Sequence, residues 1–168
     1  CKAICDKVQA INPDIKILLG SYHPTIFPDD AIQFADAICL GEGELIFVDF
    51  LKRVQNKESL IGLEGTWVNV DGEIIKNPKR ALMTQAELED RPFMNYTLKD
   101  SFVFSQADSA VLPLTQKDFF RQMGTVYNTI WSVGCPYRCS FCSQDKLNDM
   151  DPGYADYRGP SPTYIINE

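Results

Sequence analysis

The chain has 168 residues, the length of one domain or slightly more, and its 45% hydrophobic content excludes a wholly disordered chain. Its 16 Lys and Arg against 23 Asp and Glu give a net charge of −7, which argues against nucleic acid or an anionic membrane surface as a partner. No apolar run approaches the roughly 20 residues of a membrane span, and no signal peptide opens the chain, so a cytoplasmic location is expected.

Residues 1–58 alternate between helical and strand patterns. Three helices are expected: one with Ile4, Val8 and Ile11 on its apolar face, one that begins at Pro28, and one whose apolar face is Phe47, Phe50, Leu51 and Val54. The expected strands are residues 15–19 and 37–40. Two strands about 22 residues apart with a helix between them predict parallel pairing through a right-handed crossover. We therefore predict an α/β fold in which this region is the second half of a doubly wound domain.

Residues 59–114 change character and are predicted to form a hairpin and a linker. Two β-forming stretches flank the pair Asp71-Gly72. An Asp-Gly pair supplies the positive φ angles of a type I′ turn, which connects two antiparallel strands.

Residues 115–168 are predicted to begin a further folded domain. A capping box at Thr115 predicts a short helix, and the β-forming residues 125–131 predict a strand after it. Cys1 stands where Met would open a chain, and another helix begins at Ser161, close to the last residue. We interpret the chain as a fragment that is cut at both ends.

The positions of the six cysteines do not indicate three disulfides. Cys39 lies inside an apolar strand pattern, where a free thiol behaves as a small hydrophobe. Cys1 and Cys5 are four residues apart on a helical pattern, a spacing with poor disulfide geometry. The others form a C-x₃-C-x₂-C run directly after a predicted strand: Cys135, Cys139 and Cys142. Metal or redox chemistry in a reducing compartment is the better interpretation.

Three thiolates within this run favour an iron–sulfur cluster. Structural zinc usually takes four ligands, and no Cys or His follows Cys142 to complete such a set. Three thiolates can hold three irons of a 4Fe–4S cluster and leave the fourth iron open to a small molecule. Zinc and three buried structural cysteines are the alternatives.

The cysteine run resembles the signature of radical S-adenosylmethionine (SAM) enzymes, because an aromatic residue, Phe141, precedes the last cysteine. The resemblance implies that the three cysteines hold a 4Fe–4S cluster whose open iron is chelated by SAM. It implies reductive cleavage of SAM to a 5′-deoxyadenosyl radical, with Phe141 beside the adenine and Tyr137 also at the cofactor. It further implies a (β/α) barrel whose first strand is residues 125–131, and an electron donor such as flavodoxin or ferredoxin.

A second resemblance covers the N-terminal region. Residues 19–25 and 41–44 are similar to the end of the cobalamin-binding domain that precedes the barrel in one large subgroup. Both stretches follow the carboxyl ends of predicted parallel strands, where doubly wound sheets bind ligands. The resemblance implies cobalamin contacts at Gly20, Ser21, Gly41, Glu42 and Gly43. The alternative is that these residues form tight strand-to-helix turns that hold no ligand.

Two positions depart from the subgroup's pattern. Many cobalamin domains carry D-x-H-x-x-G, whose histidine ligates cobalt, but His23 has Ser21 two residues before it and Ile26 three residues after it. We interpret His23 as a loop residue with a satisfied hydrogen bond. Ser21 stands where the subgroup more often has a second glycine.

Together the two resemblances predict three parts. They are the C-terminal half of a doubly wound cobalamin-binding domain (1–58), a β-hairpin linker (59–114), and the first strand and cluster loop of a truncated radical SAM barrel (115–168). The predicted function is radical methyl transfer or rearrangement on a small-molecule or lipid-like substrate, and the chain alone is expected to be inactive. The alternatives are a methylthiotransferase-type radical SAM protein and a non-catalytic cobalamin or iron–sulfur binding module.

Overall fold

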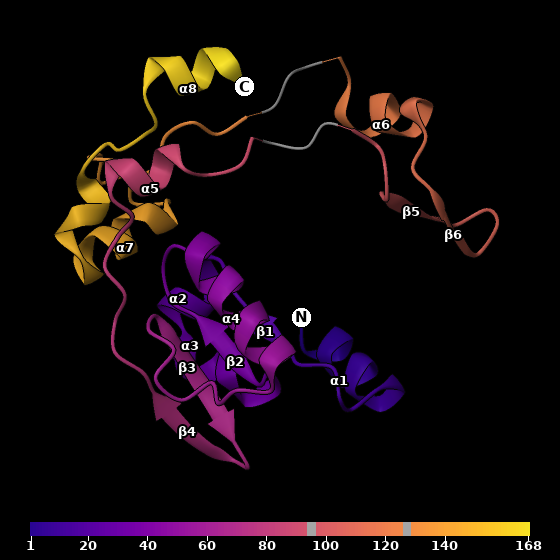
Figure 1. Ribbon diagram of the computed structural model, residues 1–168, viewed down its shortest axis with the longest axis horizontal. Helices are drawn as coiled ribbons and strands as arrows, with labels where there is room; N and C mark the ends of the chain where they lie inside the picture. The colour runs from indigo at the N-terminus through magenta and orange to yellow at the C-terminus, as the bar shows by residue number, and fades with distance from the viewer. Residues whose placement is uncertain (94–96, 126–128) are drawn as a thin grey trace. The chain divides into compact units, whose positions relative to one another are not determined.

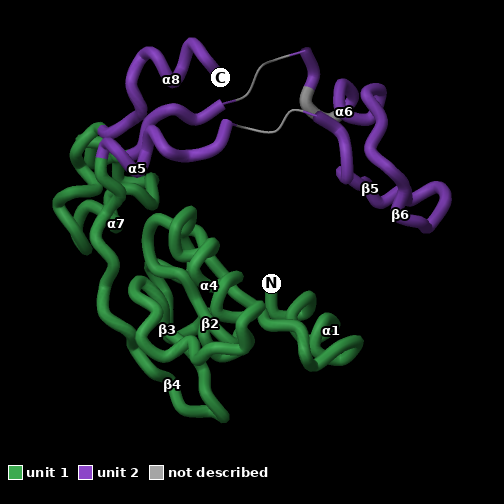
Figure 2. Tube along the Cα trace, in the orientation of Figure 1, with its two compact units in different colours: residues 1–84, 134–157 green, residues 85–133, 158–168 purple. Residues whose placement is uncertain are grey.

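The computed structural model describes residues 1–93, 97–125 and 129–168. The chain forms two compact units, one of residues 1–84 and 134–157 and the other of residues 85–133 and 158–168 (Figure 2). Because residues 134–157 belong to the first unit, the cysteine run and the N-terminal α/β region share one compact body.

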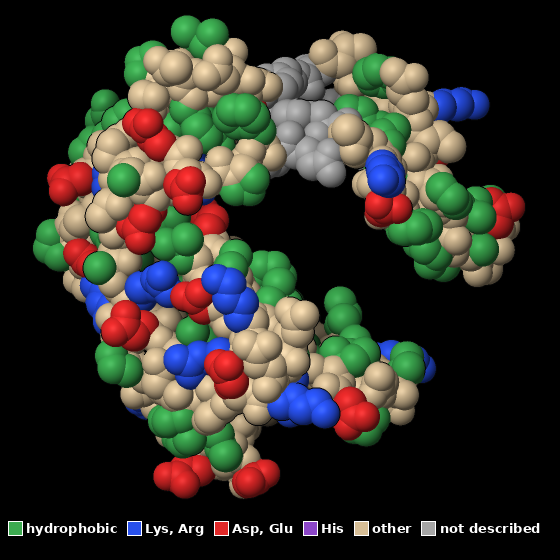
Figure 3. Space-filling model, viewed as in Figure 1, with side chains coloured by type: hydrophobic (Ala, Val, Ile, Leu, Met, Phe, Trp, Pro, Cys, Tyr) green, Lys and Arg blue, Asp and Glu red, His purple; other side chains and the backbone are tan. Residues whose placement is uncertain are grey.

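The first unit contains a four-stranded sheet with helices packed on both faces (Figure 1). Its elements are α1 (Lys2–Ile11), β1 (Leu18–Leu19), α2 (Tyr22–Ile26), α3 (Pro28–Ala31), η1 (Ile32–Phe34), β2 (Ala37–Cys39), α4 (Glu44–Asn56), β3 (Thr66–Val70), β4 (Glu73–Lys76), α7 (Ser143–Met150) and η2 (Pro152–Ala155). Figure 3 shows acidic and basic side chains interspersed on the visible face of this unit. Such exposed charges contribute little to stability.

The strands lie in the order β1-β2-β3-β4. β1 and β2 are parallel, with Leu18 opposite Ala37, which confirms the predicted crossover pair. The predicted hairpin is also confirmed, since Asp71 and Gly72 have φ angles of 52° and 92° between β3 and β4. The sequence placed this hairpin in a linker, whereas β3 pairs antiparallel with β2 and continues the same sheet. Strand pairing is a long-range contact, which no local pattern encodes.

Two hydrophobic clusters cover the two faces of the sheet. Ile38 of β2 packs with Ile32 on the face covered by α3 and η1, whereas the preceding residue, Ala37, packs with Phe50 of α4 on the other face. Successive residues of a strand point to opposite faces, so one strand supplies both clusters. Full burial of an Ile or Phe side chain contributes about 1.5–3 kcal/mol, and these contacts hold the ends of β1 and β2 in place.

Several predicted elements differ in extent. The strand predicted over residues 15–19 is shorter (β1), and the helix that opens at Pro28 ends at Ala31 and continues as the 3₁₀ turn η1. Helix α2 was not predicted. Its Pro24 lies in the first turn, where a missing N–H breaks no helical bond. In α1 the predicted apolar face is largely exposed, with Ile4 69% and Ile11 73% exposed. A helical period shows that a face is apolar, and only packing decides whether it is covered.

Among its described residues, the second unit has one helix before a β-hairpin in the sequence, one helix after it, and a third at residues 162–167. Its elements are α5 (Gln85–Glu89), β5 (Phe102–Ser105), β6 (Ala110–Pro113), α6 (Gln116–Met123) and α8 (Pro162–Asn167). The capping box is confirmed, because the Thr115 side chain accepts from the Asp118 N–H and the Asp118 carboxylate accepts from the Thr115 N–H. Ser161 caps α8 as predicted. The hairpin β5-β6 lies in a stretch that the sequence analysis assigned to a linker.

The strand predicted over residues 125–131 is wrong where it can be examined. Residues 126–128 lie outside the described residues, and residues 129–131 belong to no strand. Val133 instead forms one antiparallel bridge with Arg158, with N···O distances of 2.8 and 2.9 Å. β-forming residues become a strand only where a neighbouring strand pairs with them. None of the helices in the described ranges is long and apolar enough to cross a membrane.

Candidate functional site

The cysteine loop, residues 134–142, begins against the turn that follows α7. Gly134 has a φ of 89°, and a Cβ at this position would overlap the carbonyl group of Asp156, so the position requires glycine. The next residue, Cys135, donates its backbone N–H to the carbonyl oxygen of Tyr154 at 3.0 Å. The start of the loop is therefore fixed by backbone contacts.

The three cysteines of the loop are free thiols. Cys135 is half-buried, and Cys139 and Cys142 are exposed. Cys142 is the N-cap residue of α7, and its N–H donates to the Cys139 carbonyl oxygen at 2.9 Å. No three His, Cys, Asp or Glu side chains of the described residues are arranged as a metal site, so the structure does not bring the three sulfurs together. Their chemistry nevertheless fits an iron–sulfur cluster, since they are accessible thiols of a single loop.

Arg138 connects the middle of the cysteine loop to α7. Its Nη1 atom lies 3.1 Å from Oδ1 of Asp145 and also pairs with the carboxylate of Asp149. Hydrogen bonds to Asp149 and then to Asp145 raise the pKa of Arg138, and the guanidinium lowers the pKa of Asp149 in turn. Arg138 and Asp149 are exposed and Asp145 is half-buried, so this link orders the loop more than it stabilises the fold.

The two aromatic residues predicted at the cofactor are exposed. The side chain of Tyr137 is 72% exposed and that of Phe141 is 92% exposed. Their rings are therefore available for stacking, and their roles toward SAM stay predictions.

The predicted cobalamin contacts lie where β1 and β2 end, and we name Gly20, Ser21, Gly41, Glu42 and Gly43 the strand-end rim. Thr25, which the sequence analysis missed, joins the two halves of this rim. Its hydroxyl donates to the Ser21 carbonyl oxygen at 2.9 Å and accepts from the Gly41 N–H at 3.0 Å. Thr25 is only 4% exposed, so the bridge lies in the interior. No sequence signal singled out this threonine, because its partners belong to two different turns.

Ser21 adopts a backbone conformation that favours glycine. Its φ is 79° and its ψ is −167°, and its side chain makes no capping hydrogen bond to α2. This explains in physical terms why the related subgroup more often has a glycine here. A side chain is nevertheless present at the rim.

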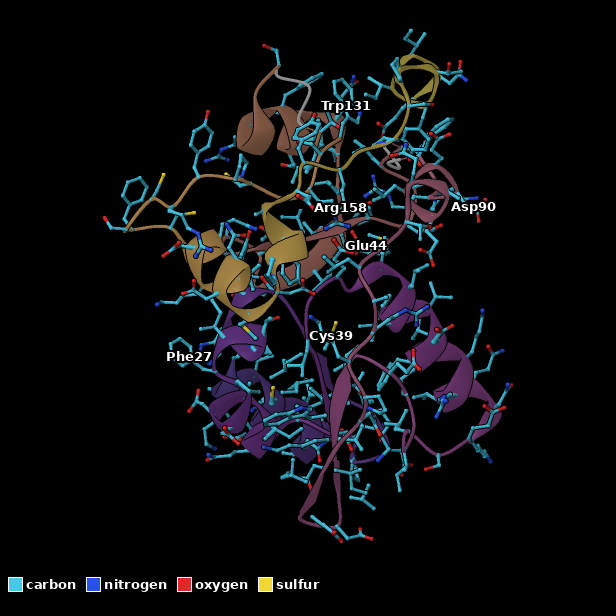
Figure 4. The ribbon with its side chains drawn as sticks, turned by 90° about the vertical axis from the view of Figure 1, so that its left-hand side faces the viewer. Phe27, Cys39, Glu44, Asp90, Trp131 and Arg158 are labelled. Atoms are coloured by element: carbon cyan, nitrogen blue, oxygen red, sulfur yellow. The ribbon has the colours of Figure 1, made fainter. Side chains whose placement is uncertain are left out.

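Glu42 and Gly43 face other parts of the first unit. The Glu42 carboxylate accepts a hydrogen bond from the Met83 N–H at 2.6 Å, so its charge is used to hold the chain after β4. Gly43 is the N-cap of α4, and a Cβ on it would lie 3.6 Å from the sulfur of Cys39. Cys39 lies in the interior of the unit, as predicted (Figure 4). Burial, and secondarily the charge of Glu44, raises the pKa of this thiol to about 11.

A cavity of about 200 Å³ adjoins the strand-end rim. Gly41, Trp67 and Tyr154 are among its lining residues, and Lys76 lies over the Trp67 ring at 3.7 Å from the ring centroid. Tyr154 follows α7, so the segment after the cysteine loop forms one wall of a cavity at the rim. The sequence contains no signal for this contact, because the two segments are far apart along the chain.

His23 is paired with a carboxylate. Its Nε2 lies 2.9 Å from Oδ2 of Asp30, and its ring packs 5.7 Å from that of Phe27. The expected hydrogen bond of His23 is thus confirmed, although the residue belongs to α2 rather than to a loop.

No known protein-family profile matches the chain, but three curated proteins are similar to it. They are an uncharacterized methyltransferase of Pyrococcus horikoshii (26% identity over 137 residues), the anaerobic magnesium-protoporphyrin IX monomethyl ester cyclase of Rubrivivax gelatinosus (25% over 169), and the cobalamin-dependent radical SAM methyltransferase TokK of Streptomyces tokunonensis (25% over 136). The alignments cover 79%, 95% and 77% of this chain but 26%, 26% and 18% of these proteins, so the chain spans about a quarter of their length or less.

Solved structures show the same fold. The radical SAM methyltransferase TsrM of Kitasatospora setae, solved with tryptophan and a SAM analogue, matches 99% of this chain with a TM-score of 0.65 and 16% identity, over 29% of its own length. OxsB, a cobalamin-dependent SAM radical enzyme solved with aqua-cobalamin and SAM, matches 98% with a TM-score of 0.57 and 19% identity, over 20% of its own length. The predicted mixed α/β fold is thus confirmed. TokK is named as a cobalamin-dependent radical SAM methyltransferase, and this similarity agrees with the resemblance stated for the sequence.

Proposed function

We propose that the chain is part of a cobalamin-dependent radical SAM methyltransferase in which Cys135, Cys139 and Cys142 hold a 4Fe–4S cluster. The observation that carries this proposal is a loop of three free thiols in C-x₃-C-x₂-C spacing, in the same compact unit as a rim at the ends of two parallel strands. The similarity to TokK also supports it.

In this proposal the chain's own residues hold and orient the cofactors. When bound, the cluster supplies the electron that cleaves SAM reductively, and cobalamin supplies a carrier for the methyl group. The exposed rings of Tyr137 and Phe141 offer aromatic faces for the adenine of SAM. The strand-end rim offers backbone to cobalamin, whereas the Glu42 carboxylate is engaged with Met83. The substrate is proposed to be a small or lipid-like molecule, and the electron donor a flavodoxin or ferredoxin.

Anaerobic reconstitution of the 168-residue chain with iron and sulfide tests the cluster. We expect about four irons per chain, a brown chromophore, and a spectral change on addition of SAM. Replacement of any one of the three loop cysteines by Ala should abolish the chromophore. Cys1→Ala is the matched control, because Cys1 is also an exposed free thiol and should be dispensable. Full iron content in a variant that lacks all three loop cysteines would contradict the proposal.

The same preparation distinguishes the alternatives. About eight irons per chain would favour a methylthiotransferase-type protein, which carries a second cluster. A cluster whose spectrum does not respond to SAM would favour a non-catalytic iron–sulfur or cobalamin module. For cobalamin, electron paramagnetic resonance (EPR) of the cobalt(II) form should be the same with and without His23→Ala, because the residues around His23 depart from the D-x-H-x-x-G pattern of a cobalt-ligating histidine. Nitrogen coordination that is lost in this variant would contradict the proposed rim.

A further inference from the structure

A buried amide lies behind the cysteine loop. Asn148 of α7 is only 2% exposed, and its Nδ2 donates to the carbonyl oxygen of Cys135 at 2.9 Å. The Oδ1 of Asn148 accepts a hydrogen bond from Nε2 of Gln144 at 3.1 Å. Nε2 of Gln144 also donates to the carbonyl oxygen of Tyr154 at 3.0 Å. A buried amide is costly unless its polar atoms are paired. This network therefore favours a single arrangement of α7 against the loop.

Cys135 is held on both sides of its Cα atom. Its N–H donates to the Tyr154 carbonyl oxygen, and its own carbonyl oxygen accepts from Asn148. Because both flanking peptide planes are fixed, the direction of the Cα–Cβ bond of Cys135 is fixed as well. Helix α7 starts directly after Cys142, its N-cap residue. One short helix thus connects the third cysteine of the loop to the backbone of the first.

We propose that Asn148 is a positioning residue for the cluster: through the carbonyl group of Cys135 it holds the first cysteine at a set place relative to the third. This inference rests on the proposed function. Asn148 acts through backbone and does not itself bind the metal. Removal of its N–H donor leaves a carbonyl group without its partner and frees the Cys135–Pro136 peptide plane. The consequence is weaker retention and altered geometry of the cluster.

The test compares Asn148→Asp with Thr66→Val in the full chain. Asp keeps the shape of Asn but places a carboxylate oxygen where the amide nitrogen donates. Thr66 is a matched control, since it is fully buried in the same unit and its hydroxyl donates to one backbone carbonyl, that of Leu63, at 2.7 Å. Thr66→Val loses this donor and also the oxygen that accepts from Nδ2 of Asn77 at 3.0 Å, whereas Asn148→Asp loses one donor and places a carboxylate oxygen against a carbonyl oxygen. Thr66 lies on β3 rather than at the cysteine loop. Thermal unfolding of the cluster-free proteins measures the shared structural loss.

Two readouts do not depend on activity: the rate at which a chelator removes iron, and the EPR signal of the reduced cluster with and without SAM. For Asn148→Asp we expect roughly fivefold faster iron loss, the fold-change of one lost hydrogen bond, and a changed EPR signal. Thr66→Val should keep wild-type values for both, although it also lowers Tm. If Asn148→Asp does not fold, Gln144→Ala replaces it in the same two measurements. Gln144 is half-buried, and its loss removes the hydrogen bond that Oδ1 of Asn148 accepts.

The outcomes separate this inference from the proposed function. If the wild-type chain takes up a cluster and Asn148→Asp retains it with wild-type kinetics and spectrum, the positioning role is wrong and the cluster proposal stands. If Thr66→Val loses iron equally fast, the effect is general destabilisation and the positioning role is also wrong. If the wild-type chain binds no cluster, both proposals fall.

Discussion

The hydroxyl group of Tyr154 occupies the space that a side chain on Gly41 would need. Gly41 lies in the bend between β2 and α4, and Tyr154 lies in the 3₁₀ turn η2 after α7, within the same compact unit. This contact makes the segment that follows the cysteine loop part of the strand-end rim. The packing of Gly41 against Tyr154 can be measured as the coupling between substitutions of the two residues.

Gly41→Ala should destabilise the first unit by roughly 2–4 kcal/mol, because a Cβ meets Tyr154 and the φ of 90° is unfavourable for Ala. Addition of Tyr154→Phe removes the nearest atom and should recover about 1 kcal/mol of this loss, leaving the backbone strain. Urea unfolding of the wild-type chain, both single variants and the double variant measures the coupling. Strict additivity of the two changes would contradict the contact.

Ser21→Gly should stabilise the chain. The backbone of Ser21 lies in a region that is nearly exclusive to glycine and costs about 1–3 kcal/mol for other residues, a cost that the entropy of glycine in the unfolded chain partly offsets. We expect a gain of roughly 1 kcal/mol in the free energy of unfolding, and no gain for Ser21→Ala, which keeps the strained Cβ. A denaturation midpoint that falls in Ser21→Gly would show this assignment to be wrong.

In the folded chain, Cys39 should react slowly with thiol reagents. With a pKa of about 11, caused mainly by burial and then by Glu44, about one Cys39 in a thousand is a thiolate at pH 8. A thiol reagent should therefore modify the exposed Cys139 quickly, and Cys39 only after unfolding. Mass spectrometry of the labelled peptides measures this, and rapid labelling of Cys39 in the native chain would contradict its burial.

The same pKa predicts a pH dependence of stability. The folded-state pKa of Cys39 is raised above the ordinary value of 9.0, so its neutral thiol favours the folded state below pH 9, and this contribution is lost as the pH rises toward about 11. Cys39→Ala should be less stable below pH 9 because it leaves a cavity, and the difference from wild type should shrink as the pH rises from 9 to 11. A difference that does not change with pH would count against the assignment.

Asp149 should have a pKa below the ordinary value of an aspartate because it accepts a hydrogen bond from Arg138. Its folded-state pKa is lowered, so the contribution of this pair is present above the ordinary pKa of 3.8 and is lost as the pH falls through the folded-state value. In Arg138→Gln, nuclear magnetic resonance titration of Asp149 should move toward the ordinary value. An unchanged titration would show that the pair does not form in solution. Lys146→Gln is a useful control, since Lys146 contributes less to the same shift.

Much of the fold and part of the candidate site followed from local patterns in the sequence. The Asp71-Gly72 turn and the cap at Thr115 depend on the conformational preferences of neighbouring residues, and both are confirmed. The spacing of the cysteine run and the glycines after two predicted strands are likewise local features. These features carry the resemblance from which the cofactors are proposed, and each involves residues close together in the chain.

Only the tertiary structure decided which of these features meet. The pairing of β3 with β2, the bridge of Thr25 across the rim, the contact of Tyr154 with Gly41 and the hydrogen bond from Asn148 to Cys135 each join groups from different elements. Such contacts depend on the whole packed chain, since closing a long loop is favourable only when many interactions form together. Local preferences therefore determined the elements and the chemistry of the site, and cooperative packing determined their arrangement.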